Sequence, residues 1–120
     1  MNKKTLVLGA STNPSRYSFL AINKLVDNQC EVVAIGLKKG KVAGVNIEIE
    51  KIPFNKIDTL TLYLNPQRQV EYYEYVLDLK PNRVIFNPGT ENQEFYKILT
   101  EKGIKYEIAC TLVLLGTNQY

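Results

Sequence analysis

Short apolar runs alternate with segments of helical periodicity along the chain, and this alternation constrains the fold more than any other feature. The run at 4–8 contains continuous apolar residues, as a strand buried on both faces requires, and further strands are predicted at residues 31–35, 59–64, 83–86 and 105–109. Between them, apolar residues at helical spacing predict helices at 17–27, after Pro66 and after Asn92. Strands that alternate with helices form parallel sheets covered on both faces, so we expect a three-layer α/β fold.

The same pattern predicts a single Rossmann-like domain over residues 1–120. A chain of 120 residues is long enough for one hydrophobic core, and no linker-like stretch divides it. We expect a five-stranded, mainly parallel sheet in the order 3-2-1-4-5, with the strands numbered along the chain. In that order the direction of winding reverses between the strands at 4–8 and 83–86, and ligands are expected at the carboxyl ends of the strands there.

Two stretches carry weaker signals. Glycines and a proline interrupt residues 37–58, where only 45–50 alternates in the way of a short edge strand. The apolar run that opens residues 111–120 fits more than one type of element, and its state stays open.

Turn and cap residues predict where the helices begin and end. Asn65 is expected to cap a helix whose first residue is Pro66, and residues 90–93 form a capping-box pattern for the next helix. Asn28 and Gly103 are expected to end helices in the left-handed conformation.

Histidine is absent from the sequence, which narrows the functions of the chain. The commonest general base, the usual partner of a nucleophile and the commonest metal ligand are all missing, so we expect no catalytic residue and no metal site. Cys30 and Cys110 lie in or beside apolar segments, which indicates packed thiols. A net charge of +3, spread along the chain, favours a small anionic ligand over nucleic acid. The apolar run near the start is too short to enter a membrane, so a cytoplasmic protein is expected.

The loop 9–18 after the first predicted strand is the strongest candidate for ligand binding. Its single Gly9 replaces the three glycines of the dinucleotide fingerprint, which disfavours ordinary NAD binding. Arg16, the free N–H groups of the helix start and four hydroxyl side chains together favour phosphate. The hydroxyl residues are Ser11, Thr12, Ser15 and Ser18. The alternative is that these hydroxyls only cap the helix.

The turn 36–40 after the second predicted strand gives an independent indication. An NAD site has an acid there to bind the ribose, whereas this turn carries Lys38 and Lys39. Two lysines attract a phosphorylated ribose, which favours coenzyme A with its 3′-phosphate or NADP with its 2′-phosphate. The alternative is a basic turn that contacts only water.

Several motifs resemble those of a known family. The loop Gly9-Ala10-Ser11-x-x-Pro14-x-Arg16-x-Ser18 is similar to the opening loop of small, stand-alone CoA-binding proteins, which resemble the N-terminal domain of the succinyl-CoA synthetase α-subunit. Val42-x-Gly44, Ile52-Pro53 with Ile57-Asp58, and Asn87-Pro88-Gly89-x-Glu91-Asn92 resemble later family motifs, so the similarity covers nearly the whole chain.

This resemblance implies a Rossmann-like CoA-binding domain with Ser11, Arg16 and Ser18 near the phosphates. It further implies that the turn 36–40 lies near the adenosine, while the turns at Asn65 and Gly89 border the cleft. The chain departs from the family where Ala34-Ile35-Gly36 replaces a Val-Asn-Pro type ending and where Leu64-Asn65 replaces an arginine. It also lacks the Asp-Arg before Cys110 and the Glu-His pair after it. We therefore expect a divergent member.

The residues predicted to bind the cofactor share a position in loops at the carboxyl ends of strands. They are Gly9, Ala10, Ser11, Thr12, Asn13, Arg16, Tyr17, Ser18, Gly36, Lys38, Asn65, Pro66, Asn87, Pro88, Gly89 and Asn92.

Three hypotheses of function follow. The first is non-catalytic binding of coenzyme A or an acyl-CoA, because candidate proton-transfer groups such as Glu91, Glu107, Tyr63 and Cys110 lack a neighbouring base. The second is an NADP-dependent or other nucleotide-using oxidoreductase. The third is an interaction or regulatory protein with a degenerate cofactor site. It includes a homodimer through the tyrosines at 72, 73 and 75, of which at least one is expected to be exposed.

Overall fold

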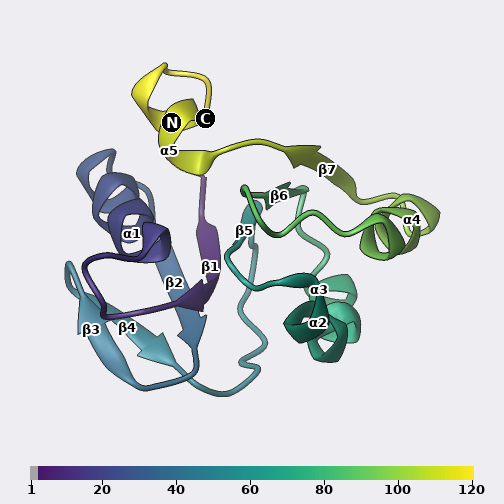
Figure 1. Cartoon of the computed structure of the whole chain (residues 1–120), viewed down its shortest axis with the longest axis horizontal. Helices are drawn as coiled ribbons and strands as arrows, with labels where there is room; N and C mark the ends of the chain where they lie inside the picture. Colours follow the sequence, from purple (N-terminus) through teal and green to yellow (C-terminus); the bar gives the residue numbers. More distant parts are fainter. Residues whose placement is uncertain (1–2) are drawn as a thin grey trace.

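In the computed structural model, which describes residues 3–120, a twisted sheet lies between two layers of helices (Figure 1). The strands are β1 Thr5–Ala10, β2 Val32–Gly36, β3 Gly40–Val42, β4 Val45–Glu48, β5 Thr59–Leu62, β6 Arg83–Phe86 and β7 Lys105–Ile108. The helices are α1 Tyr17–Asp27, α2 Pro66–Gln69, α3 Tyr73–Leu79, α4 Gln93–Glu101 and α5 Thr111–Gly116, with a 3-10 turn at Val70–Tyr72. The α/β class is as predicted, and the undecided segment that begins at residue 111 forms α5.

The sheet differs from the prediction in strand number and order. It has seven strands in the order β3-β4-β2-β1-β5-β6-β7, parallel except for the β3–β4 pair. All five predicted strands are present, as β1, β2, β5, β6 and β7, but β3 and β4 are additional, so the predicted number of strands is wrong. The order 3-2-1-4-5 is also wrong, because β5 pairs with β1, whereas that order puts it beyond β2. The place beside β2 belongs to β4, which a tight hairpin at Ala43 and Gly44 turns back from β3. Both turn residues have positive φ, 51° and 81°, as the favoured hairpin turn requires.

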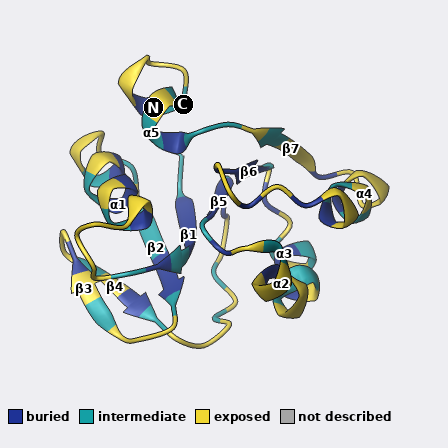
Figure 2. Cartoon of the chain, viewed as in Figure 1, coloured by how far each residue is buried: buried dark blue, intermediate teal, exposed yellow. Residues whose placement is uncertain are grey.

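Each face of the sheet carries its own hydrophobic cluster. Val7 of β1 packs with Ile22 and Leu25 of α1 on one face, where α5 adds Leu115. Leu6 and Leu8 point to the opposite face, which α3 and α4 cover. Most residues of the central strands are accordingly buried, and the helices expose their outer sides (Figure 2). Within residues 3–120 no helix is both long and apolar enough to cross a bilayer.

Two of the predicted helix boundaries are confirmed and two are shifted. Asn65 Oδ1 accepts the Arg68 N–H at 2.9 Å and caps α2, and Gly103 follows α4 with φ +72°. The capping box at 90–93 is wrong, because the cap of α4 is Asn92. Asn28 has φ −88°, so it is not the left-handed residue after α1; its neighbour Gln29, at φ 64°, is.

The tyrosine-rich segment after α2 is not one continuous helix. The 3-10 turn Val70–Tyr72 separates α2 from α3, so the three tyrosines do not follow a single 3.6-residue period. Tyr72 and Tyr73 are half-buried and Tyr75 is 8% exposed, with its hydroxyl donating to the Ile52 carbonyl. The expectation of an exposed tyrosine is wrong. Val70, at the start of the 3-10 turn, is 54% exposed.

The two ends of the described chain meet at the amino ends of the strands. The Tyr120 hydroxyl bonds with Thr5 Oγ1 at 2.5 Å, and Lys3 Nζ donates to the Tyr120 carbonyl oxygen at 2.5 Å. The Arg83 guanidinium lies over the Tyr120 ring, 4.6 Å from its centre. Figure 1 shows both ends beside α5, on the side of the sheet opposite to the strand carboxyl ends.

Tyr63, which follows β5, has a buried hydroxyl group that makes no hydrogen bond of normal geometry among the described residues, although the Thr61 and Thr111 hydroxyls lie near it. Burial raises the pKa of this phenol to about 12. Burial therefore favours the neutral form of the phenol over the phenolate. Its contribution to folding stability is present below the ordinary tyrosine pKa of 10 and is lost as the pH rises through about 12.

Replacing Tyr63 with Phe should raise the free energy of unfolding at neutral pH by about 1 kcal/mol, because it removes an unpaired buried hydroxyl. The variant should also lose less stability than the parent between pH 10 and about 12. Urea unfolding at neutral and alkaline pH measures both effects. Tyr75→Phe is the matched control, since it removes a hydroxyl that has a partner and should cost about 1 kcal/mol. A stability loss in Tyr63→Phe at neutral pH would contradict the assignment.

Candidate functional site

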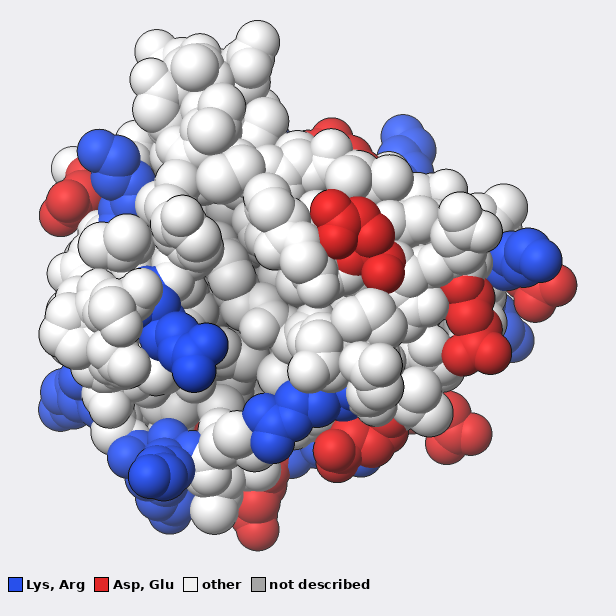
Figure 3. Space-filling view, in the orientation of Figure 1, with Lys and Arg blue, Asp and Glu red and all other residues white. Residues whose placement is uncertain are grey.

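The winding of the sheet reverses between β1 and β5, and the loops that follow β1, β2 and β5 meet at that point. A small pocket there has a volume of about 20 Å³, enough for about one water molecule. It is lined by Gly9, Ile35, Gly36, Leu37, Leu64, Arg68, Glu71 and Tyr72. Figure 3 shows a wider hollow on this face, between the α1 side and the α2 side of the molecule. The ends of these strands therefore open onto a groove.

Three glycines allow these loops to touch. A Cβ atom on Gly36 would lie 2.2 Å from the Ala10 carbonyl oxygen, and one on Gly40 would lie 2.4 Å from the Thr12 methyl carbon. Gly9 has φ +101°, and its Cβ would lie 2.8 Å from the Tyr63 carbonyl carbon. These glycines are therefore needed where protein loops meet one another. Ligand binding by Gly9 and Gly36 stays a prediction.

The loop 11–16 is held in shape by its own side chains. Ser11 Oγ accepts the Asn13 N–H at 3.0 Å. Asn13 Oδ1 accepts both the N–H and the hydroxyl of Ser15, at 3.0 and 2.8 Å. Two amides of the loop are thus occupied, and these groups are not available to grip a phosphate as the loop stands.

The start of α1 is different, because no side chain caps it. Arg16 occupies the cap position in an extended conformation, with φ −89° and ψ 142°, and its side chain makes no capping bond. The alternative that the loop hydroxyls only cap the helix is therefore wrong. The first N–H groups of the helix, at Tyr17 and Ser18, are left for solvent or a ligand.

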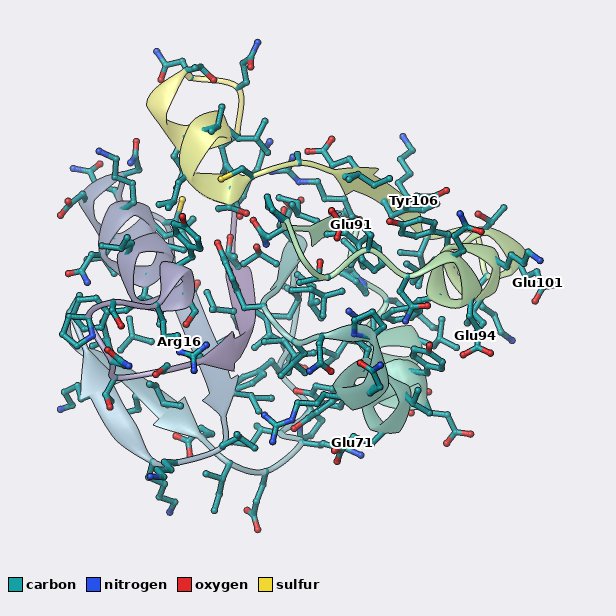
Figure 4. All side chains as sticks on the ribbon, in the orientation of Figure 1. Arg16, Glu71, Glu91, Glu94, Glu101 and Tyr106 are labelled. Atoms are coloured by element: carbon teal, nitrogen blue, oxygen red, sulfur yellow. The ribbon has the colours of Figure 1, made fainter. Side chains whose placement is uncertain are left out.

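Charge is distributed unevenly around the groove. Figure 4 shows Arg16 reaching from the loop before α1 toward the middle of this face, and Glu91 on the far side, on the loop after β6. Lys38 and Lys39 lie exposed on the turn after β2, and basic side chains gather over this part of Figure 3. An anion is favoured on the α1 and β2 side, away from Glu91.

Asn13 bonds within its own loop, and the other three asparagines among the predicted site residues are also occupied by the protein. Asn87 is 2% exposed; its amide donates to Thr61 Oγ1 at 2.6 Å and its Oδ1 accepts the Thr111 N–H at 2.9 Å. Asn65 and Asn92 cap α2 and α4. They position the loops, and any contact with a ligand stays a prediction.

The remaining predicted residues are spread over the rim. Thr12 packs against Gly40, and Pro66 opens α2 at the edge of the groove. Pro88 and Gly89 are exposed on the loop after β6, where the Gly89 N–H donates to Glu91 at 2.9 Å. This loop belongs to the acidic side of the face.

The sequence prediction missed six residues that line the pocket. They are Ile35, Leu37, Leu64, Arg68, Glu71 and Tyr72. Arg68 lies in the first turn of the helix that Asn65 is predicted to cap, so the sequence indicates a basic residue at the start of that helix. The wrong strand order placed that helix away from the first strand and hid its relation to the pocket. Burial raises the pKa of the Tyr72 phenol, Glu71 raises it further and Arg68 opposes the rise.

Comparisons with known proteins agree on the type of domain. A family model described as a CoA binding domain matches residues 3–116. No curated protein matches the chain. A solved structure described only as an uncharacterized protein is 48% identical, with a TM-score of 0.97, and the match covers 100% of this chain and 99% of that one.

More distant solved structures share the fold. A hypothetical protein from Pyrococcus horikoshii OT3 is 27% identical, with a TM-score of 0.81 over 92% of this chain and 80% of that one. A protein from Thermus thermophilus is 23% identical, with a TM-score of 0.85 over 98% and 90% of the two chains.

The Gly36→Ala substitution should lower the free energy of unfolding by about 2 kcal/mol or more, because the new Cβ would collide with the backbone of the β1 loop. Gly116→Ala is the matched control: it meets no atom within 4 Å and lies in a helix, so it should be neutral or gain about 0.5 kcal/mol. Chemical unfolding of both variants measures the difference. Equal effects would show that the close contact at Gly36 does not constrain the fold.

Proposed function

The chain belongs to the family of CoA binding domains, and from this premise we propose that it binds coenzyme A in the groove where β1, β2 and β5 end. The observation that carries the proposal is the uncapped start of α1 beside the unpaired guanidinium of Arg16. The site binds the cofactor without transforming it.

The diphosphate lies at the start of α1. Free N–H groups and the positive end of the helix dipole favour an anion there, and Arg16 supplies a forked pair of donors. Within residues 3–120 no ion pair engages Arg16. The internal bonds of the loop hold it open, so that little ordering is required when a phosphate arrives.

The adenosine part lies toward the turn after β2. Leu37, which is 67% exposed, and Leu64 offer apolar surface for the base. Lys38 and Lys39 supply positive charge for the 3′-phosphate on the ribose. Arg68 adds a further cation at the pocket. This arrangement explains why the acid of an NAD site is replaced by lysines.

The absence of a suitable proton-transfer group supports binding without chemistry. The sequence contains no histidine, and the pocket offers only the exposed Glu71 and the phenol of Tyr72 for proton exchange. Burial moves the pKa of Tyr72 further above neutrality. The Tyr72 phenol is therefore not poised as a base near pH 7. NADP carries a ribose phosphate too, and its binding is the alternative that the experiment must distinguish.

The experiment compares coenzyme A, dephospho-coenzyme A, NADPH and NAD by thermal shift and isothermal titration. Coenzyme A at one hundred times its dissociation constant should stabilise the protein by about 2.7 kcal/mol. Arg16→Ala should weaken binding about tenfold or more, because a charge-assisted contact to phosphate is lost. Dephospho-coenzyme A should bind more weakly than coenzyme A to the parent chain. A Lys38→Ala/Lys39→Ala variant should bind coenzyme A and dephospho-coenzyme A with equal affinity, because it lacks the two lysines that favour the 3′-phosphate.

Lys102→Ala, an exposed substitution beyond α4, is the control for a general change of charge and should leave the affinity unchanged. Stabilisation by NADPH with none by coenzyme A would replace the proposal with the NADP alternative. No response to any of the four ligands would remove both.

A further inference from the structure

β7 forms one edge of the sheet, and its outer side is open. It pairs with β6 alone, and no other segment of residues 3–120 lies along it (Figure 1). Most of the strand is exposed: Ile108 is 58% and Tyr106 is 37% exposed, and Lys105 is exposed as well. Long or apolar edge strands are usually covered, because unpaired backbone groups attract another strand.

The direction of the backbone groups can be read from the bond after the strand. The Ala109 N–H donates to the Phe86 carbonyl at 3.1 Å, so it points inward to β6. Backbone groups of alternate residues in a strand bonded on one side point the same way. Glu107 and Lys105 therefore also point their backbone groups inward. The N–H and C=O groups of Tyr106 and Ile108 point outward and are available to a partner.

We propose that a second copy of this chain pairs with β7 as an antiparallel strand, related by a two-fold axis that passes by Tyr106. Tyr106 of one copy then exchanges both backbone hydrogen bonds with Tyr106 of the other. The two sheets join into one. A self-complementary contact of this kind is the common arrangement of a two-fold dimer.

Charge selects this register from its neighbours. With Tyr106 on the axis, Lys105 of each copy lies directly opposite Glu107 of the other. A shift of the axis to Glu107 would place two carboxylates opposite each other, and a shift to Lys105 would oppose two ammonium groups. Opposite charges in facing positions stabilise a strand pair and like charges destabilise it. Glu107 is held in place by Arg83 through Oε1 at 3.0 Å, and its side chain is 43% exposed.

The other face of β7 is apolar and fits the same register. Tyr106 stacks on Tyr96 of α4, with ring centres 4.5 Å apart and planes at 3° (Figure 4 shows Tyr106 beside α4). In the dimer the exposed Ile108 faces Ile104 of the second copy, which covers apolar surface that water now contacts. Two strands, β5 and β6, separate this edge from the groove at β1. The dimer leaves the groove open and is independent of the proposed function.

Sedimentation of the whole chain over a range of concentrations up to about 1 mM tests the proposal, since that range reaches the weak end of the affinity scale. The parent chain should reach twice its mass of 13.7 kDa. Tyr106→Pro removes the outward N–H and should weaken association about tenfold or more, and proline is tolerated where an edge N–H faces solvent. Tyr106→Val is the matched control: it loses the same ring and keeps the N–H, so it should still associate.

A charge-reversal pair tests the register without proline. Lys105→Glu and Glu107→Lys should each weaken association, because like charges then face each other across the axis. An equal mixture of the two variants should form a mixed dimer, in which every facing pair is complementary again, and the effect should shrink in high salt. A parent chain that stays monomeric, or a mixture no more associated than either variant alone, would overturn the proposal. Circular dichroism of each variant confirms that it is folded.

Discussion

The arrangement of this protein depends on one close backbone contact, between the end of β1 and the end of β2. The Ala10 carbonyl oxygen would lie 2.2 Å from a side chain at position 36, so only glycine lets the two strand ends meet. Because they meet, the loop 11–16 is held against the sheet and delivers the start of α1 to the reversal point of the winding. The uncapped helix start and Arg16 therefore face the groove as a consequence of packing, before any ligand is considered.

The two sides of the groove differ in how far their polar groups are bonded to the rest of the protein. On the β6 side, Asn87 joins β5, β6 and α5 through hydrogen bonds that use its whole amide group, and the rim carries Glu91. On the α1 side, the first amides of the helix and the basic residues make no such hydrogen bonds among the described residues. A buried polar network that is fully satisfied fixes one geometry. The hydrogen-bonded β6 side therefore holds the groove in shape, and the charges favour an anion on the α1 side.

Local signals in the sequence predicted local structure well, and the long-range pairing escaped them. The cap at Asn65 and the stop at Gly103 follow from the chemistry of single residues, and both were predicted. The place of β5 beside β1 depends on the β3–β4 hairpin, whose short strands gave only a weak alternating pattern around Gly44. That error moved the reversal point and concealed Arg68, Glu71 and Tyr72. The positions of the asparagines in loops after strands predict ligand contacts, yet the neighbours of an amide in the fold decide whether it is free, and the sequence does not reveal those neighbours.

The meeting of the chain ends has a practical consequence for handling the protein. Lys3 and Tyr120 bond to each other at the amino ends of the strands, so their backbones are close enough for a short peptide to join them. The exposed hairpin at Ala43 and Gly44 offers a place for new ends, far along the chain from the old ones. A circular permutant made in this way keeps every strand neighbour of the sheet. Figure 1 shows the C-terminal end on the side of the sheet opposite to the groove, so a tag joined to Tyr120 begins away from it.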